Sequence, residues 1–357
     1  MHELIKRLSE VSAPSGGEAE LMRILKDEVL RIRPSDGVSI ECAEAFDGSL
    51  AVKLSCHDNA PDEEHPRKLA VTCSVDEVGF MVKSHGGTGM LRIAPVGIKD
   101  PALLVGRRVT VNGVRGSVGA VPVHLSKGKS VPDMADVYVD VGCKTKKEAA
   151  LTVPLGSFGG FDTRFSLFGV ENFLARGKAL SGRAPAAVIL TVLECLARGN
   201  VRLPYEIYFV FIARGRLPIC ASAAVMERLG VDCAISVGSR PSGDTPVGDS
   251  HCRVGGGVCM PFAEEKYEYD VLLSESLKWV AESARVNVQR VPPRTGLVDY
   301  SVLRMKNAGL RVASVSVPVR YMESACEVVS LRDTESCAAL LREALNGELA
   351  RFLGGRG

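Results

Sequence analysis

The sequence lacks a strong net charge, because its 44 Lys and Arg residues nearly balance its 42 Asp and Glu residues and leave a formal charge of +2. This balance gives no reason to expect a nucleic-acid or membrane-surface partner. No apolar run approaches the length of a bilayer-spanning helix, and the N-terminal residues hold no apolar core of a signal peptide. These absences predict a soluble protein of the cytoplasm, with no membrane partner.

Paired-cysteine motifs are also missing. The 11 cysteines are an odd number, they are scattered along the chain, and no two of them form a Cys-x-x-Cys motif. A disulfide framework is therefore not expected. Reduced thiols, most of them buried in an intracellular protein, fit this distribution better.

Two kinds of pattern are present. From about residue 80 to 173, short alternating runs are separated by Gly and Pro, which is typical of a small β-barrel. On either side, buried strands alternate with amphipathic helices. The clearest helices are expected over 183–198, 298–308 and 331–352. We therefore predict an α/β fold: a mixed sheet flanked by helices, built from residues 1–78 plus 175–357, with a β-barrel inserted at 79–174.

One strand suggests a functional site. An apolar run over 69–74 leads into Asp76 and Glu77. In an α/β sheet the carboxyl ends of the strands are where ligands and catalytic groups collect. The same residues would also fit a core strand that stops at a solvated acidic turn, so the rest of the chain must decide.

Seven short motifs follow one another along the chain: Ala13–Gly16 with Glu18, Val75–Phe80, Gly119–Pro122 with His124, Tyr138–Gly142, Lys178–Leu180 with Arg183, Asp244–Pro246, and Arg320–Tyr321 with Ser324. In this order they resemble the tetrahedral metallo-aminopeptidases, a family that includes glutamyl and deblocking aminopeptidases. The resemblance implies an α/β domain of the zinc-peptidase type and an inserted barrel used for dimerisation. It also implies dimers that assemble into hollow twelve-subunit tetrahedra.

The family holds two zinc or cobalt ions through five ligands and uses a Glu as general base. The resemblance places these positions, in chain order, at Ser74, Ser181, Arg214 (the base), Gly215, Gly238 and Glu323. Only Glu323 keeps a side chain that suits a metal ion. Realigning the base does not help, because residues 212–219 contain no acidic residue. The sequence therefore predicts no catalytic residue and no metal cofactor.

The residues retained near the former site, according to the resemblance, are Asp76, Glu77, Arg183, Arg320 and Tyr321. Removing two dications leaves Asp76 without counter-charge. We predict that Arg214 or Arg240 enters the vacated region and pairs with Asp76 or Glu323 as a charge cluster. If that cluster is partly unpaired, its cations would bind a carboxylate such as a peptide terminus.

The sequence thus predicts a pseudo-peptidase that acts as an oligomeric scaffold, regulatory or structural subunit. It would form a homo-oligomer, a dimer or dodecamer, or assemble with an active paralogue or larger complex. Two alternatives stay open. One is an active aminopeptidase with a metal site rebuilt from Asp76, His124, Asp244, Glu323 and cysteines. The other is a module that binds a peptide or small anion.

Overall fold

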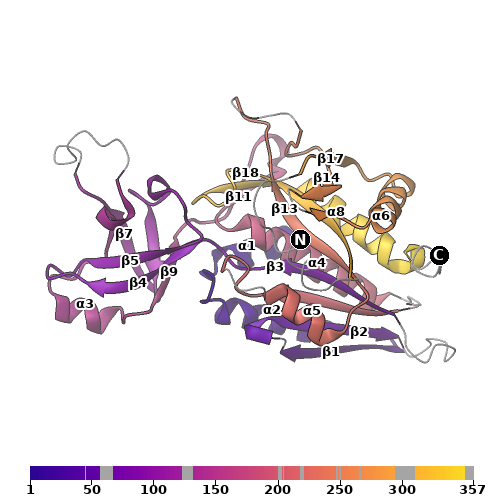
Figure 1. Ribbon diagram of the computed structural model, residues 1–357, viewed down its shortest axis with the longest axis horizontal. Helices are drawn as coiled ribbons and strands as arrows, with labels where there is room; N and C mark the ends of the chain where they lie inside the picture. Colours follow the sequence, from indigo (N-terminus) through magenta and orange to yellow (C-terminus); the bar gives the residue numbers. More distant parts are fainter. Residues whose placement is uncertain are drawn as a thin grey trace.

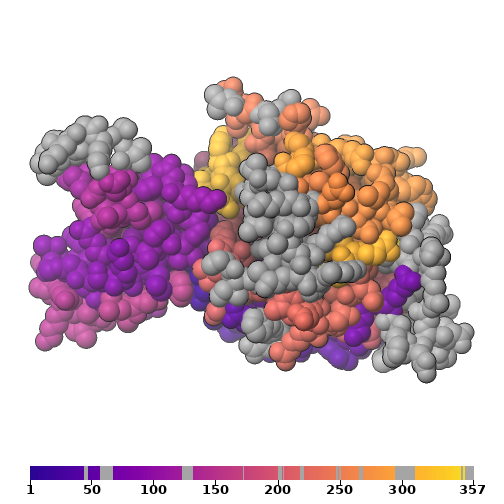
Figure 2. Space-filling view, in the orientation of Figure 1, coloured from indigo at the N-terminus to yellow at the C-terminus, as the bar shows by residue number. Residues whose placement is uncertain are grey.

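The computed structural model of the chain describes residues 1–349, except 45, 57–66, 123–131, 200–202, 204, 218–220, 247, 249–250, 265–266 and 294–309. A large mixed sheet is covered by helices, and a smaller closed barrel lies beside it (Figure 1). In the space-filling view the barrel forms a lobe set off from the α/β body (Figure 2). The predicted fold, a mixed sheet flanked by helices with a small β-barrel, is confirmed.

The large sheet runs in the order β1-β2-β12-β3-β13-β18-β19-β11-β10, with β14 paired to β18 and β17 paired to β14. Its strands are β1 (Val38–Glu44), β2 (Leu50–Cys56), β3 (Lys68–Ser74), β10 (Ser166–Phe168), β11 (Leu174–Gly177), β12 (Glu206–Ile212), β13 (Cys233–Pro241), β14 (Val258–Pro261), β17 (Val288–Val291), β18 (Arg311–Arg320) and β19 (Glu327–Ser330). The four neighbours β12, β3, β13 and β18 are parallel. Their carboxyl ends therefore lie along one edge, where an α/β protein places its site.

Helices cover both faces of this sheet. They are α1 (His2–Glu10), α2 (Ala19–Arg31), α4 (Leu180–Arg198), α5 (Ala221–Leu229), α6 (Val271–Ser283) and α8 (Leu331–Glu343). In β12, Phe209 and Phe211 belong to the core beneath α4, while Val210 and Ile212 belong to the core beneath α5. Side chains alternate across a strand, so a strand that is apolar at every position is buried on both faces.

The sequence was expected to contain no apolar run long enough to span a bilayer, and the central helix, α4, corrects this expectation. It is long and apolar enough to cross a membrane, although 83% of its most apolar stretch is buried inside the protein. It packs against α1, α8 and the strands of the sheet. A helix that is buried all round in a large core has this composition. Packing inside the α/β body therefore accounts for its apolar character.

The barrel closes in the order β4-β5-β8-β7-β6-β9. Its elements are β4 (Gly79–His85), β5 (Leu91–Val96), β6 (Arg108–Val111), β7 (Val114–Gly119), β8 (Tyr138–Asp140), β9 (Phe158–Phe161) and the helix α3 (Lys146–Thr152). Inward-facing residues such as Phe80, Ile93 and Val139 form a core separate from that of the large sheet. Closure leaves the barrel without an unpaired sheet edge.

The barrel strands end at Phe161, and the next strand, β10, pairs with β11 in the large sheet. The C-terminal helix is shorter than the sequence predicted. The last helix was expected over 331–352, but α8 ends at Glu343 and a π-helical turn follows over Ala344–Glu348. The helix expected over 298–308 lies outside the described residues.

Candidate functional site

The positions that the resemblance assigned to metal ligands gather at the carboxyl edge of the parallel strands. Ser74 ends β3 and pairs in register with Ile212, the last residue of β12. Gly238 lies in β13, opposite Ser316 of β18. Ser181 lies in the first turn of α4, where its carbonyl oxygen accepts a hydrogen bond from the Ser239 hydroxyl at 2.8 Å.

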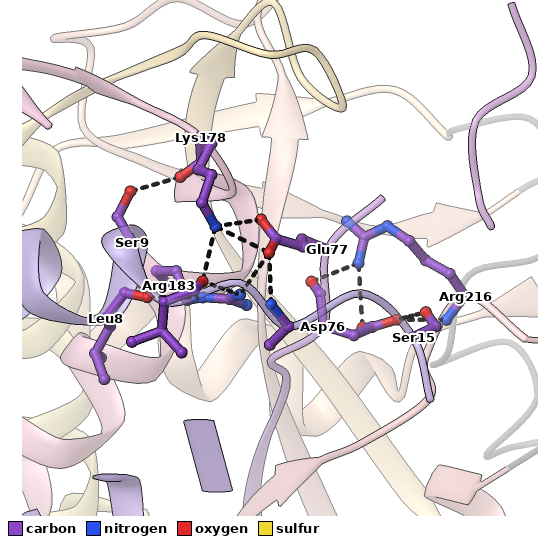
Figure 3. A network of polar contacts seen from close by, with 10 residues as sticks. Leu8, Ser9, Ser15, Asp76, Glu77, Lys178, Arg183 and Arg216 are labelled. Atoms are coloured by element: carbon purple, nitrogen blue, oxygen red, sulfur yellow. Dashed lines mark hydrogen bonds and ion pairs between the residues drawn. The ribbon is translucent and has the colours of Figure 1, made fainter. Parts of the chain in front are cut away.

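At this edge the Asp76 carboxylate is held by Arg216 (Figure 3). The Arg216 backbone N–H donates to Asp76 Oδ2 at 2.9 Å, and Arg216 Nη1 donates to Oδ1 at 3.1 Å. The same Nη1 donates to the backbone oxygen of Asp76 at 2.7 Å, and the Ser15 hydroxyl donates to Oδ2. The Asp76 side chain is fully buried. A buried carboxylate needs this pairing, because an uncompensated charge inside a protein is costly.

Glu323 lies on the other side of the same arginine. Its Oε1 is 3.9 Å from Arg216 Nε, and its backbone has a left-handed conformation with φ 64°. That turn directs the Glu323 N–H to Glu327 Oε1 at 2.6 Å. The hollow lined by Arg216, Ser181 and these two glutamates is too narrow for a water molecule. Arg216 therefore lies between two acidic side chains, of which Asp76 is fully buried and Glu323 is partly exposed.

Glu327 completes the site, although no local sequence pattern pointed to it. It is buried, and its carboxylate accepts hydrogen bonds from the Ser181 backbone N–H at 2.6 Å and from the Ser181 hydroxyl at 2.9 Å. Burial raises the pKa of Glu327, and these backbone and hydroxyl donors act against that rise. The Glu327 carboxylate thus accepts hydrogen bonds both from the first turn of α4 and from the turn that carries Glu323.

A second buried network lies next to the first (Figure 3). Lys178 Nζ donates to both carboxylate oxygens of Glu77, at 2.9 and 2.8 Å, and Arg183 Nη2 lies 3.6 Å from Glu77 Oε1. The Ala13 backbone N–H donates to the same Oε1 at 2.6 Å. Burial lowers the pKa of Lys178, and the charge of Glu77 opposes that change. The network fastens the segment after α1 to the end of β3 and to α4.

The predicted charge cluster had the wrong arginines. Arg214 Nη1 pairs instead with Asp47 Oδ1 at 2.8 Å, and Arg240 pairs with Glu264 at 2.9 and 3.1 Å. Side chains alternate across β13, so with Ser239 facing α4, Arg240 must face away from it. Arg214 has a left-handed backbone with φ 58°, and its N–H is held by Glu18 Oε1 at 2.7 Å.

The other predicted arginines are paired as well. Arg320 forms a two-point contact with Asp244, with its Nη2 2.5 Å from Oδ2, and Arg183 faces Glu77. With the pairs of Arg214, Arg216 and Arg240, each arginine of the predicted group has a carboxylate partner. The positive charges of this group are therefore balanced by carboxylates of the chain itself.

Three further residues named from the sequence, Tyr321, His124 and Gly215, take no part in the buried networks that the structure describes. Tyr321 follows β18 in a left-handed conformation with φ 57° and is 59% exposed, so its side chain is not part of the buried networks. His124 lies outside the described residues. Gly215 follows Arg214 in the turn after β12 and has no side chain that could bind a metal ion.

The residues present do not fit the two-ion centre that the resemblance implies. Within the described ranges, no three His, Cys, Asp or Glu side chains gather in a way that could hold a metal ion. The carboxylate of Asp76 is engaged by Ser15 and Arg216, and Glu327 is engaged by the start of α4. A guanidinium is permanently charged and cannot serve as a ligand. The positive charge of Arg216 thus lies beside these carboxylates, at the place where a metal ion would have to bind.

A mixed sheet with its functional positions at the ends of parallel strands, and a closed barrel inserted between those strands, defines a protein of the aminopeptidase-like class. The sequence profile of the M42 glutamyl aminopeptidases matches residues 55–340. This chain therefore belongs to the M42 glutamyl aminopeptidase family, as its motifs indicated.

Relatives cover nearly the whole chain. The glutamyl aminopeptidase of Lactococcus lactis is 25% identical over 96% of this chain and 95% of its own length. The structure of a TET aminopeptidase from a marine sediment archaeon of the Thaumarchaeota superimposes with a TM-score of 0.88 at 23% identity, covering 98% of this chain and 99% of that one. The Pyrococcus horikoshii TET1 peptidase, which can assemble into a tetrahedron or a large octahedral shell, has a TM-score of 0.82 at 22% identity, covering 96% and 98%.

Proposed function

We propose that this chain is a non-catalytic member of its family, a pseudo-peptidase that acts as an oligomeric scaffold or regulatory subunit in the cytoplasm. One observation carries the proposal. The guanidinium of Arg216 lies 3.1 Å from the buried Asp76 carboxylate and 3.9 Å from that of Glu323. A protein cation thus supplies counter-charge at the edge of the sheet where the family binds its metal ions.

The chemistry of a guanidinium supports this reading. A metal ion promotes hydrolysis by polarising the scissile carbonyl and by lowering the pKa of a bound water. An arginine has no open coordination position, keeps its proton at all working pH values, and so provides neither effect. The place of the family's general base is held by a second cation, Arg214, whose side chain pairs with Asp47. Neither residue can remove a proton from water.

Metal content and hydrolysis test the proposal directly. The full chain, purified without added metal and then incubated with Zn²⁺ or Co²⁺, should contain far less than one ion per chain after gel filtration. It should release no nitroaniline from a panel of aminoacyl-nitroanilides. An active aminopeptidase of the same family, treated in parallel, controls for reagents and handling. Cobalt-dependent turnover by this chain would overturn the proposal.

The scaffold role rests on the barrel and on the assemblies named for relatives. We propose that residues 79–174, carrying the barrel, form a dimerisation domain, and that residues 1–78 plus 175–357 form the aminopeptidase-like domain. Leu151 and Leu155, in and just after α3, are 78% and 60% exposed. Large apolar residues placed together on a surface favour an interaction with another protein.

Assembly is tested separately. Native mass spectrometry of the chain alone should show a dimer or dodecamer, and Leu151→Asp should shift this distribution toward smaller species. Glu148→Gln, a change on the same helix, serves as a matched control. The chain should also enter mixed oligomers with an active paralogue from the same cell. A monomer that joins no such paralogue would contradict the scaffold role while leaving the absence of catalysis intact.

A further inference from the structure

Two cysteines lie close together in the part of the body that follows β13. The Sγ atoms of Cys252 and Cys259 are 3.1 Å apart, and both residues are free thiols. Cys259 is fully buried in β14, while Cys252 is 4% exposed. A disulfide has a sulfur–sulfur distance of about 2.05 Å, so an approach of about 1 Å would suffice to form one.

The chain between them is a fixed turn. Gly255 and Gly257 have φ values of +86° and +98°, and a side chain at Gly257 would meet the carbonyl oxygen of Asn287 at 2.2 Å. The carboxylate of Asp333 accepts the N–H of Gly255 at 2.6 Å and the N–H of Gly257 at 2.9 Å. These contacts hold the two thiols facing each other, so that little chain entropy is lost when they join.

We propose that Cys252 and Cys259 form an oxidation site, at which hydrogen peroxide converts the two thiols into a disulfide. Cys252, the less deeply buried of the two, attacks the peroxide first. Its sulfur gains one oxygen as the O–O bond breaks, giving a sulfenic acid and one water. The sulfur of Cys259 then attacks the sulfenic sulfur, the S–O bond breaks, and a second water leaves. Two thiols and one peroxide yield one disulfide and two waters, with two electrons passing to the peroxide oxygens.

The hydrogen bonding and the burial of the two cysteines determine which sulfur attacks first. The hydrogen bond to Cys252 is the largest influence that raises the pKa of Cys259, and burial adds to it. The raised pKa keeps Cys259 protonated, and Cys252 is the less deeply buried of the two residues, so Cys252 is the one that reacts first. Because both sulfurs are largely buried, we expect slow oxidation that proceeds through brief openings of the loop.

The bond would tie down a loop that touches the candidate site. The Cys252 carbonyl accepts the N–H of Gly243 at 2.7 Å, and the next residue, Asp244, holds Arg320 at the end of β18. Glu323 lies in the turn that follows Arg320. A disulfide at Cys252 would thus restrain the neighbouring loop, whose Asp244 holds Arg320 just before the turn that carries Glu323. No group of the buried Asp76 network takes part in the oxidation. The inference is independent of whether the protein is catalytic.

Peptide mapping tests the site. The full chain is reduced, freed of reductant, treated with hydrogen peroxide, alkylated and digested with trypsin without reduction. Because trypsin cuts after Arg253, the bond joins two otherwise separate peptides. We expect this cross-linked pair in the native chain and in the control Cys233→Ala, a buried thiol of β13, and in neither Cys252→Ala nor Cys259→Ala. The cross-link should disappear on adding a thiol reductant.

A melting experiment provides the second measurement. Closing a loop of this length should raise the melting temperature by about 3 °C in the native chain and in Cys233→Ala, and leave Cys252→Ala unchanged. If Cys259→Ala fails to fold, Cys252→Ala alone decides the assignment. Two thiols that both remain alkylatable after peroxide, or that oxidise singly to sulfinic acids, would overturn the proposal. A cross-link to any other cysteine would also do so.

Discussion

Arg216 donates three hydrogen bonds to Asp76. Its backbone N–H and its Nη1 donate to the carboxylate, and the same Nη1 donates to the Asp76 backbone carbonyl at 2.7 Å. This joins the turn after β12 to the turn after β3, two segments that are neighbours only because their strands pair in parallel. The arginine thus carries out a structural task, that of keeping a buried carboxylate compensated, at the edge where the family places its chemistry.

Arg216→Ala should destabilise the protein by about 3 kcal/mol. Removing one partner of a buried ion pair leaves the other charge uncompensated, and here the Asp76 side chain is fully buried. The free energy of unfolding from chemical denaturation measures the loss. Arg214→Ala is the matched control, since its side chain is 38% exposed and its pair with Asp47 should contribute under about 1 kcal/mol. Equal losses for the two variants would contradict the assignment.

The pair of Glu77 and Lys178 should show strong coupling. Both side chains are only 3% exposed, so Lys178→Met alone should cost about 3 kcal/mol. Combining it with Glu77→Gln should cost about 1–3 kcal/mol less than the sum of the two single changes, because the double variant leaves no buried carboxylate without its lysine. A double-mutant cycle by chemical denaturation measures this difference. Strict additivity would show that Arg183 alone, at 3.6 Å, compensates Glu77.

Much of the fold could be read from the sequence, because burial patterns are local. The continuous apolar run of β12 predicts a strand buried on both faces, and the short alternating runs between Gly and Pro predict the barrel. The same patterns located Asp76 and Glu77 at the end of β3. β10 was not predicted, because a three-residue strand that pairs with β11 leaves no pattern of its own in the sequence.

The contacts within the site were harder to predict, because they depend on where side chains point. The sequence alone does not distinguish Arg214, Arg216 and Arg240. The left-handed φ at Arg214 and the direction in which the side chains of β13 point decide which of these arginines contacts Asp76. Glu327 reaches Ser181 from 146 residues away, across the turn between β18 and β19. No spacing in the sequence carries that information.

Gly182→Ala should lower the stability by about 1 kcal/mol. A methyl group there would lie 3.0 Å from the carbonyl oxygen of Asp76 and 3.3 Å from that of Ser74, and backbone atoms cannot move aside as a flexible side chain can. The better helix propensity of alanine offsets part of this cost. Gly87→Ala, where nothing lies within 4 Å, should change the stability by less than about 0.5 kcal/mol. A Gly182→Ala variant more stable than the native chain would mean that α4 is free to shift away from β3.

Asp333→Asn should remove a pH dependence of stability. Burial raises the pKa of Asp333 from its ordinary value to about 6, although the N–H groups of Gly255 and Gly257 favour the ionised form. The folded state therefore binds this proton more tightly than the unfolded state does, and stability falls as pH rises from about 4 to 6.

Asparagine at position 333 binds no proton in this range. The native chain should thus lose about 2–3 kcal/mol relative to Asp333→Asn between pH 4 and pH 7. Urea unfolding of both proteins across this range measures the difference, in which other titrating groups cancel. Parallel curves would show that Asp333 has an ordinary pKa and that its two backbone donors outweigh burial.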